Sequence, residues 1–383
     1  MQVSWRPMRY TRRALLWSVS SALLAACSGQ RETQVSPTAF PQETPTARVG
    51  EVGPSPTPES TATATPVGTM QRSVKHVKIS TQLLTASATL YIGIERGYFA
   101  DEGLEVELVT QGTLGDAIPF LASGEIAAGG GALSSGIFNA VAQGIPLKIV
   151  ACRTAVMPGN VFHGLLASHI HEGSIARIRD LHGKRIGNTN TEGLVAFENQ
   201  KLLESDGLSL NDVELVRIPP QDMPIALDNG AVEAVLAVEP YVTVALDMGA
   251  GYKIVDDEEF MAALGGFWPI GFFVYGPAFT DDRELGVAFM RVHLRAAQDY
   301  NEMLKSSDGL EELIDIVNKY LPVENRDLVR KMAWPGTPID GRFPEGFVGE
   351  LFQFLRSRGE VQSDMDVGSV VDVTFIDDAL ASM

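Results

Sequence analysis

Cysteine is scarce in this sequence, which has two among 383 residues, Cys27 and Cys152. No cysteine cluster exists, so a cysteine-rich active site is excluded. Hydrophobic residues make up 45% of the chain, which is enough for a sizeable core in one large or two medium domains. Cys152 ends an apolar run, LKIVAC (147–152), and is expected to be a small buried hydrophobic residue.

The common motifs of nucleotide-binding and hydrolytic enzymes are also missing. The chain has neither GxxxxGK[ST] nor GxSxG, and its glycine-rich stretch GGGALSSG (129–136) is not followed by the lysine of a phosphate site. His169 and His171 have strand spacing that could align two imidazoles, but an exposed loop is the simpler interpretation, and no metal site is predicted. The run of acids from Asp256 to Glu259 is interpreted as a solvated turn.

Positive charge is in the minority, and the formal net charge is −18 at pH 7. Such a surface repels nucleic-acid phosphates and anionic lipid headgroups, so neither is expected as a general partner. The exception is the N-terminus, where Arg6, Arg9, Arg12 and Arg13 occur with no acidic residue before Cys27.

The N-terminal segment is the most specific signal in the chain. The arginines are followed by ALLWSVSSALLAA (14–26), which is typical of an export signal. It is shorter than the about 20 apolar residues of a membrane span. Leu24-Ala25-Ala26-Cys27 resembles the lipobox of bacterial lipoproteins, in which the cysteine is acylated and becomes the first residue. We therefore expect a lipoprotein signal peptide over residues 1–26 and lipidation of Cys27, with a plain secretory signal as the alternative.

The next segment, residues 27–72, is rich in proline and threonine and has no hydrophobic periodicity. It cannot bury enough apolar area to offset its ordering entropy, and its prolines favour extended conformations. We expect a disordered tether between the lipidated cysteine and a folded body.

From Val74 onward, short apolar runs alternate with amphipathic segments, which predicts mainly parallel sheets covered by helices on both faces. The expected strands are 77–80, 104–109, 125–128 and 147–152, then 163–168, 184–188, 213–218 and 235–238. The expected helices are 88–96, 116–122, 135–142, 192–204, 223–227 and 240–246, and the sequence after Tyr275 is mostly helical. Two units are predicted: residues 73–158 plus 268–383, and residues 159–267.

These units carry motifs of a known family. YIGIERGYFADEGLEVELV (91–109), LASGEIAAGG (121–130), DLHGKRIGNTNTEG (180–193) and ALDNGAVEAVLAVEP (226–240) resemble ABC-importer substrate-binding proteins of the NMT1/THI5-like and SsuA/TauA family. The resemblance implies an α/β fold with two lobes, the periplasmic-binding-protein-like fold of type II. Each lobe would be a mainly parallel sheet with flanking helices, and the ligand would be captured in the cleft between the lobes. Hinge segments are expected near 154–159 and 266–271.

Ligand contacts are expected in the loops after the strands, because open α/β sheets bind ligands beyond the carboxyl ends of their strands, where helix N-termini present free N–H groups. The alternative roles are turns and caps for the polar residues and a core position for the tryptophan. In GGGALSSG, small residues are interpreted as letting a ligand approach the backbone. The predicted binding residues are Gln82, Gly112, Thr113, Gly131, Ser134, Ser135, Asn188, Thr189, Asn190, Glu239, Tyr241 and Trp268.

None of the predicted cleft loops contains Lys or Arg, whereas amide and aromatic side chains are frequent. This inventory favours a planar heterocycle, and a riboflavin-type vitamin is the first hypothesis. An aliphatic sulfonate, taurine, nitrate or a thiamine pyrimidine precursor is the alternative, and a pyrimidine-synthesising enzyme of the same superfamily is a remote one. The expected partners are the ligand and the permease and ATPase subunits of an importer. We expect a monomer without a cofactor, lipid-anchored to the extracytoplasmic side of the cell membrane.

Overall fold

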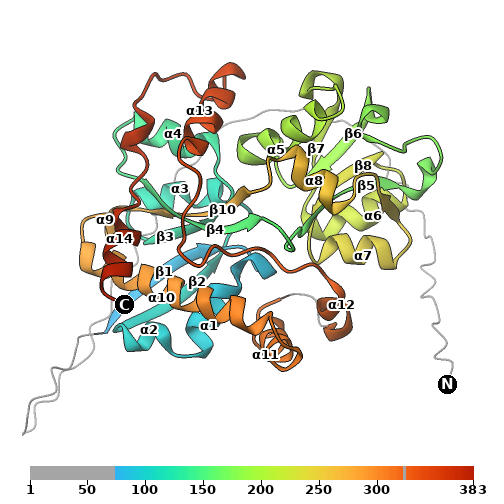
Figure 1. Cartoon of the computed structure of the whole chain (residues 1–383). Helices are drawn as coiled ribbons and strands as arrows, with labels where there is room; N and C mark the ends of the chain where they lie inside the picture. Colours follow the sequence, from blue (N-terminus) through green and yellow to red (C-terminus); the bar gives the residue numbers. More distant parts are fainter. Residues whose placement is uncertain (1–73, 322–324) are drawn as a thin grey trace, which may run out of the picture. The chain divides into compact units, whose positions relative to one another are not determined.

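The computed structural model describes residues 74–321 and 325–383 (Figure 1). These residues form two five-stranded sheets with flanking helices, which confirms the predicted α/β class. The predictions for the signal peptide, for Cys27 and for the tether lie outside the described residues.

The first sheet contains four parallel strands and one antiparallel strand. Strand β1 pairs in parallel with β2 and β3, whereas β10 pairs antiparallel with both β3 and β4. The order across the sheet is β2 (Leu104–Thr110), β1 (Lys75–Thr81), β3 (Ala128–Gly131), β10 (Trp268–Tyr275) and β4 (Lys148–Val156).

The second sheet repeats this pattern. Strand β6 pairs in parallel with β7 and β8, whereas β5 pairs antiparallel with β8 and β9. The order is β7 (Glu214–Arg217), β6 (Arg185–Asn188), β8 (Ala234–Val238), β5 (His163–Ser168) and β9 (Gly251–Lys253). In both sheets the antiparallel strand, β5 or β10, is the one that follows a crossing of the chain from the other sheet.

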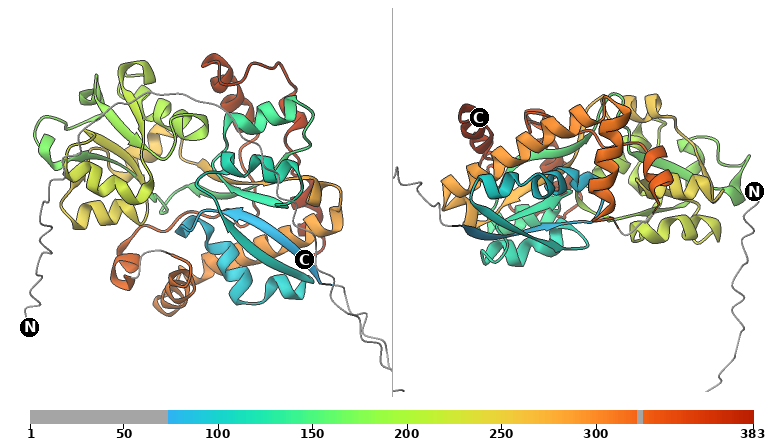
Figure 2. Two further views of the ribbon diagram at one scale, coloured as in Figure 1. Left: turned by 180° about the vertical axis from the view of Figure 1, so that it is seen from behind. Right: turned by 90° about the horizontal axis from the view of Figure 1, so that it is seen from below.

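Alternation along β10 explains how the first sheet is covered on both faces. All eight residues of WPIGFFVY are buried, and successive side chains of a strand point to opposite faces. Phe273 and Tyr275 join the core under α1 (Ala88–Glu95), α10 (Arg283–Met303) and α14 (Thr374–Ala381). Phe272 and Val274 join the core under α3 (Leu114–Ala122), α4 (Ser135–Ala142) and α13 (Phe347–Ser357). Both views in Figure 2 place α10 alongside α1.

The second sheet is also covered on both faces. Leu166 and Val235 pack with α6 (Met223–Asp228) and α7 (Tyr241–Asp247). On the opposite face, Leu165 and Leu236 share a core with α5 (Gly193–Glu204) and α8 (Asp257–Ala263). The remaining described helices are α2 (Tyr98–Asp101), α9 (Pro277–Thr280), α11 (Ser307–Asn318) and α12 (Arg326–Lys331).

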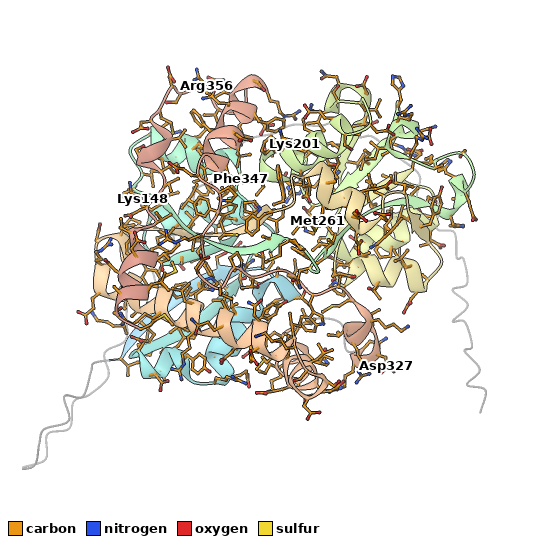
Figure 3. All side chains as sticks on the ribbon, in the orientation of Figure 1. Lys148, Lys201, Met261, Asp327, Phe347 and Arg356 are labelled. Carbon is orange, nitrogen blue, oxygen red and sulfur yellow. The ribbon has the colours of Figure 1, made fainter. Side chains whose placement is uncertain are left out.

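The helices after Tyr275 serve mainly the first sheet, as expected from their apolar spacing. Asp282 caps α10 by accepting a hydrogen bond from the Leu285 N–H group. Figure 3 shows Phe347 of α13 among the interior side chains, whereas Asp327 of α12 lies at the periphery. Within residues 74–321 and 325–383, none of the helices has the length and apolar character needed to cross a membrane.

The strand predicted at 125–128 is wrong, because the strand is the glycine run itself, Ala128–Gly131. Glycine is depleted in strands, so the sequence pattern favoured a loop there. A Cβ atom at Gly129 would clash with the side chains of Leu114 and Leu121, so glycine is what lets α3 lie this close to β3.

Another short prediction is also wrong. The run of acids starts a helix rather than a turn, because Asp256 caps α8 and forms a capping box with Glu259. The segment from His169 to His171 forms a short 3₁₀ turn with His169 and Ile170 exposed, which agrees with the exposed-loop interpretation.

Prediction: Glu233→Gln destabilises the second sheet in a pH-dependent way. Arg185 lies 2.7 Å from Glu233 and holds the pKa of that carboxyl at about 2, below its usual 4.5. A depressed carboxyl pKa stabilises the fold above the unfolded pKa, and this stabilisation is lost as pH falls toward the folded pKa. We expect a loss of about 1 kcal/mol at pH 7, given the solvent exposure of the pair, measured by urea unfolding.

The difference between the wild type and the variant should shrink as the pH is lowered from 5 to 3. Glu107→Gln, at an exposed position of β2, is the matched control and should be neutral. An equal loss at both ends of the pH range would show that the ion pair is not its cause.

Candidate functional site

A pocket lies where the carboxyl ends of strands from both sheets meet. Its empty volume is about 820 Å³ including its open mouth. Residues after β1, β2 and β3 and from β4 and β10 form one wall, and residues of β5, α5, the loop after β6 and the end of β8 form the other. This is the position that the strand-end argument predicts.

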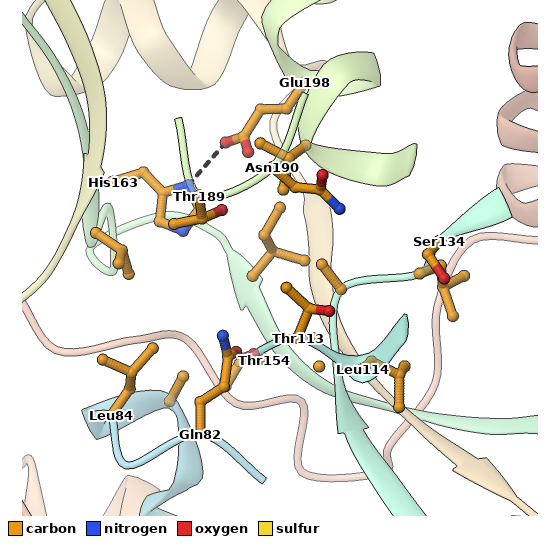
Figure 4. Close-up of a pocket in the computed structure, with 18 of the residues that line it drawn as sticks. Gln82, Leu84, Thr113, Leu114, Ser134, Thr154, His163, Thr189, Asn190 and Glu198 are labelled. Atoms are coloured by element: carbon orange, nitrogen blue, oxygen red, sulfur yellow. Dashed lines mark hydrogen bonds and ion pairs between the residues drawn. The ribbon is translucent and has the colours of Figure 1, made fainter. Parts of the chain in front are cut away.

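The first wall has polar side chains that are already held in place. The Gln82 side-chain amide donates to the Gly112 carbonyl at 2.6 Å and so ties the loop after β1 to the loop after β2. Thr113 caps α3 in a reciprocal box with Asp116. Figure 4 shows Gln82 and Thr113 on this side, across the pocket from His163 and Thr189.

The deepest polar group of this wall is Arg153 on β4, which is 2% exposed. Its Nη1 donates to the hydroxyls of Thr81 at 2.9 Å and Ser87 at 3.1 Å. Its Nε is buried without a hydrogen-bond partner, and no carboxylate lies within salt-bridge distance of Arg153 among the described residues. The guanidinium also lies 5.6 Å from the centre of the Phe273 ring.

Burial changes the titration of the groups around this arginine. Desolvation lowers the pKa of Arg153 to about 10, so it keeps its charge at neutral pH. Desolvation, together with the nearby Arg153 charge, lowers the pKa of His293 to about 3, so that imidazole is neutral. Burial raises the pKa of Tyr91 to about 12. Arg153 is therefore a buried positive charge surrounded by neutral groups.

The glycine run of β3 makes room for this arginine. A Cβ atom at Gly130 would lie 2.8 Å from Nη1 of Arg153, and one at Gly131 would lie 3.0 Å from Cβ of Leu114. The side chains that approach Gly129 and Gly130 thus come from the protein itself, whereas Gly131 lines the pocket. The expectation that the whole run admits a ligand to the backbone is wrong for the first two glycines.

The second wall contains a buried carboxylate. Glu198 of α5 has no exposed surface, and its Oε1 lies 2.9 Å from Nδ1 of His163 on β5 (Figure 4). Its Oε2 has no hydrogen-bond partner among the described residues. Thr189 and Asn190, in the loop after β6, lie beside this pair.

A backbone hydrogen bond joins the two walls at the edge of the pocket. Leu194 N–H, at the start of α5, donates to the Leu133 carbonyl at 2.8 Å. Gly193 has φ of 68°, and a Cβ atom there would lie 2.6 Å from that carbonyl oxygen. Glycine is therefore required for this contact, both for its backbone conformation and for the space.

Six of the twelve residues predicted to bind the ligand line this pocket, and two others line an adjoining hollow. Gly112 and Tyr241 border the hollow, which shares Gln82, Thr113 and Thr189 with the pocket. The residues in the pocket are Gln82, Thr113, Gly131, Ser134, Thr189 and Asn190. For these residues ligand contact stays a prediction.

The other four predicted residues do not line the pocket. Asn188 is buried and accepts a hydrogen bond from Asn199, and Ser135 is a buried first residue of α4. Glu239 accepts hydrogen bonds from Thr243 and from the Ala333 N–H group, and burial raises its pKa. Trp268 packs between Phe197 and Phe347, with ring centres at 5.1 and 5.0 Å, which is the core position named as its alternative.

The sequence reasoning missed three ionisable residues that line the pocket, Arg153, His163 and Glu198. The observation that the predicted cleft loops contain no Lys or Arg did not reveal Arg153, because Arg153 lies within a strand. A signal for two of them was present in the sequence. Arg153 follows the apolar run IVAC (149–152) directly within a buried strand, and Glu198 is spaced four residues from both Leu194 and Leu202 on the buried face of α5.

Known structures share this fold. The periplasmic nitrate-binding protein NrtA from Synechocystis PCC 6803 superposes with a TM-score of 0.65 at 16% identity, covering 81% of this chain and 89% of its own. The alkanesulfonate-binding protein SsuA from Xanthomonas axonopodis pv. citri, bound to MOPS, gives 0.60 at 16%, covering 78% and 99%. The desulfurization enzyme DSZB gives 0.57 at 15%, covering 80% and 99%. The fold is thus the two-lobed periplasmic-binding-protein fold of type II.

A match to a family model assigns the chain more narrowly than the shared fold does. The model described as NMT1/THI5 like matches residues 85–302, more than half of the chain, and the matched segment includes most residues that line the pocket. The chain belongs to the NMT1/THI5-like family, as its motifs predicted. None of the curated proteins matches the sequence significantly.

Prediction: Gly130→Ala displaces the Arg153 guanidinium. The added methyl would lie 2.8 Å from Nη1, so the arginine or β3 must shift. We expect a loss of about 1–3 kcal/mol in the free energy of unfolding, typical of overpacking, measured by chemical denaturation. Gly349→Ala in α13, with nothing within 4 Å of its Cβ, is the control and should be neutral or slightly stabilising. Equal stability of Gly130→Ala and the wild type would contradict this account of β3.

Proposed function

We propose that this chain is the extracytoplasmic substrate-binding lipoprotein of an ABC importer. The observation that carries the proposal is the pocket between strand ends of the two sheets. A small molecule in this pocket would contact residues of both sheets. Membership of the NMT1/THI5-like family and the shared fold of nitrate- and alkanesulfonate-binding proteins support it.

The chain passes twice between the two lobes, from β4 to β5 and from β9 to β10, and two lobes connected in this way suit a capture mechanism. The ligand first binds one wall, the other wall then closes over it, and a membrane permease binds the closed form. The N–H of Leu194 and the carbonyl of Leu133 form a contact that such a closure would make. The partners under this proposal are the permease and ATPase subunits, and the binding protein acts as a monomer.

The ligand is proposed to be small and to combine apolar and polar groups. A riboflavin-type heterocycle is one candidate, because Gln82 and Asn190 offer amide groups beside the apolar Leu84, Phe162 and Ile270. A compact anion such as a sulfonate, taurine or nitrate is the second, and Arg153 is the observation that favours it. A thiamine pyrimidine precursor belongs to the same test panel.

An enzymatic function is the remote alternative, and it is raised by the fold shared with the desulfurization enzyme DSZB. The single thiol among the described residues, Cys152, is fully buried, and burial raises its pKa. A nucleophilic cysteine needs the opposite, an accessible thiolate with a lowered pKa. This favours binding without covalent chemistry.

Prediction: the full chain, extracted in detergent, melts at a higher temperature in the presence of its ligand, because a ligand that binds only the native state stabilises it. The panel is riboflavin, a thiamine pyrimidine precursor, ethanesulfonate, taurine and nitrate. A ligand at 100 times its Kd adds about 2.7 kcal/mol of stability, which differential scanning fluorimetry detects. If no member changes the melting temperature, the transport function loses its support.

Prediction: Cys27→Ala abolishes lipidation of the protein. Acylation of this cysteine is proposed as the anchor, and the variant has no thiol there to accept an acyl chain. We expect labelled palmitate to be incorporated into the wild type and not into the variant, measured by metabolic labelling. The control is Cys152→Ala, which leaves the lipobox intact and should be labelled as the wild type is. A Cys27→Ala variant that still incorporates the label would contradict the lipoprotein assignment.

A further inference from the structure

Two buried charged side chains line the pocket, one on each wall. Arg153 comes from β4 of the first sheet and Glu198 from α5 beside the second. Each keeps a buried polar atom, Nε of Arg153 and Oε2 of Glu198, that has no hydrogen-bond partner in the described part of the chain. Buried charges are normally paired, because an unpaired one loses its hydration without compensation. Both side chains therefore require an explanation.

The arginine lacks a negative partner. Its two hydrogen bonds go to neutral hydroxyls, those of Thr81 and Ser87, and these hydroxyls also hydrogen-bond to each other at 2.7 Å. They orient the guanidinium but supply no compensating charge. An anionic group in the pocket would supply it, and a planar guanidinium can donate two parallel hydrogen bonds to a carboxylate or sulfonate.

The carboxylate on the opposite wall has one partner, His163. The carboxylate accepts at Oε1, so Nδ1 of His163 carries the proton of this hydrogen bond at 2.9 Å. The second oxygen, Oε2, can only accept, so its partner must be a donor. A protonated amine on a ligand would be such a donor.

The surface of the pocket as a whole is mostly apolar. It includes Leu84 and Leu114 from the first wall and Phe162, Leu236 and Val238 from the second. The apolar part of a ligand would be removed from water there, which stabilises the complex by about 25 cal/mol for each Å² of apolar area buried. The pocket thus combines a cationic pole, an anionic pole and a mostly apolar surface.

We propose that the pocket binds an amphoteric organic molecule, whose anionic group pairs with Arg153 and whose protonated amine pairs with Glu198 and His163. The inference rests on the proposed transport function and narrows its ligand. Nitrate has no donor for Glu198, and a neutral flavin has no charge for either pole. Arg153 and Glu198 are the residues that determine specificity.

The experiment uses the full chain in detergent and two matched sets of probes, with Kd measured by isothermal titration calorimetry. One set is taurine, ethanesulfonate and ethylamine, and the other is 4-(aminomethyl)benzoate, 4-methylbenzoate and 4-methylbenzylamine. In at least one set, the amphoteric probe should bind about tenfold or more tightly than either singly charged probe, since a buried charge-assisted hydrogen bond is worth about 1.5–3 kcal/mol.

The variants separate the two poles. Glu198→Gln keeps the shape and should remove the preference for the amine while leaving ethanesulfonate or 4-methylbenzoate binding intact. Arg153→Met should abolish binding of the anionic probes. Arg153→Lys, which retains the charge, should bind these probes more weakly than the wild type does. It is the second variant in case Arg153→Met folds poorly. Glu345→Gln and Arg177→Met, at exposed positions outside the pocket, are the controls and should bind as the wild type does.

The outcomes distinguish this inference from the transport function. If riboflavin or nitrate binds and neither Arg153→Met nor Glu198→Gln changes its Kd, the amphoteric ligand is rejected and transport stands. Equal affinity for the amphoteric and singly charged probes also rejects it. If none of the probes in this experiment or in the transport panel binds, both proposals fail.

Discussion

The antiparallel pairing of β4 with β10 is the interaction on which the rest of the structure depends. These two strands belong to the segments in which the chain leaves the first sheet and returns to it, and they pair from Lys148 with Tyr275 to Val156 with Trp268. The pairing shifts register near Gly271, next to Thr154. The same pair contributes to the pocket, which is lined by Arg153 and Thr154 of β4 and by Ile270 and Gly271 of β10.

A second constraint follows from the first. Arg153 is a long cationic side chain on a strand buried on both faces, so the neighbouring strands must leave space for it. Gly130 provides that space on β3, and Thr81 and Ser87 provide the hydrogen bonds that orient it. The glycine run that resembles a phosphate loop is thus a consequence of the buried arginine and of the close approach of α3. The unusual composition of β3 and the chemistry of the pocket have the same physical origin.

Much of the fold could be predicted from the sequence, because apolar periodicity reports burial directly. The strand at 163–168 and the helix at 135–142 have the predicted bounds, and the long helix α10 follows its apolar spacing. The prediction failed where contacts between distant residues determine the local conformation. Gly129 to Gly131 form a strand because they pair with β1 and β10, and glycine is needed there because Leu114 and Arg153 occupy the space where side chains would be. A second failure had a local cause. The acids from Asp256 begin a helix because Asp256 and Glu259, three residues apart, form a capping box.

The candidate site was only partly predictable. The strand-end rule located six pocket residues, since that rule depends on topology and topology follows from the order of strands and helices. It gave no account of Arg153, His163 or Glu198, which lie within a strand, at the start of a strand and within a helix. The sequence by itself determined the family, the alternation of strands and helices and the edge of the sheets at which the pocket lies. Only the tertiary structure decided which charges are buried there without partners, because pairing depends on distances between segments far apart in the chain.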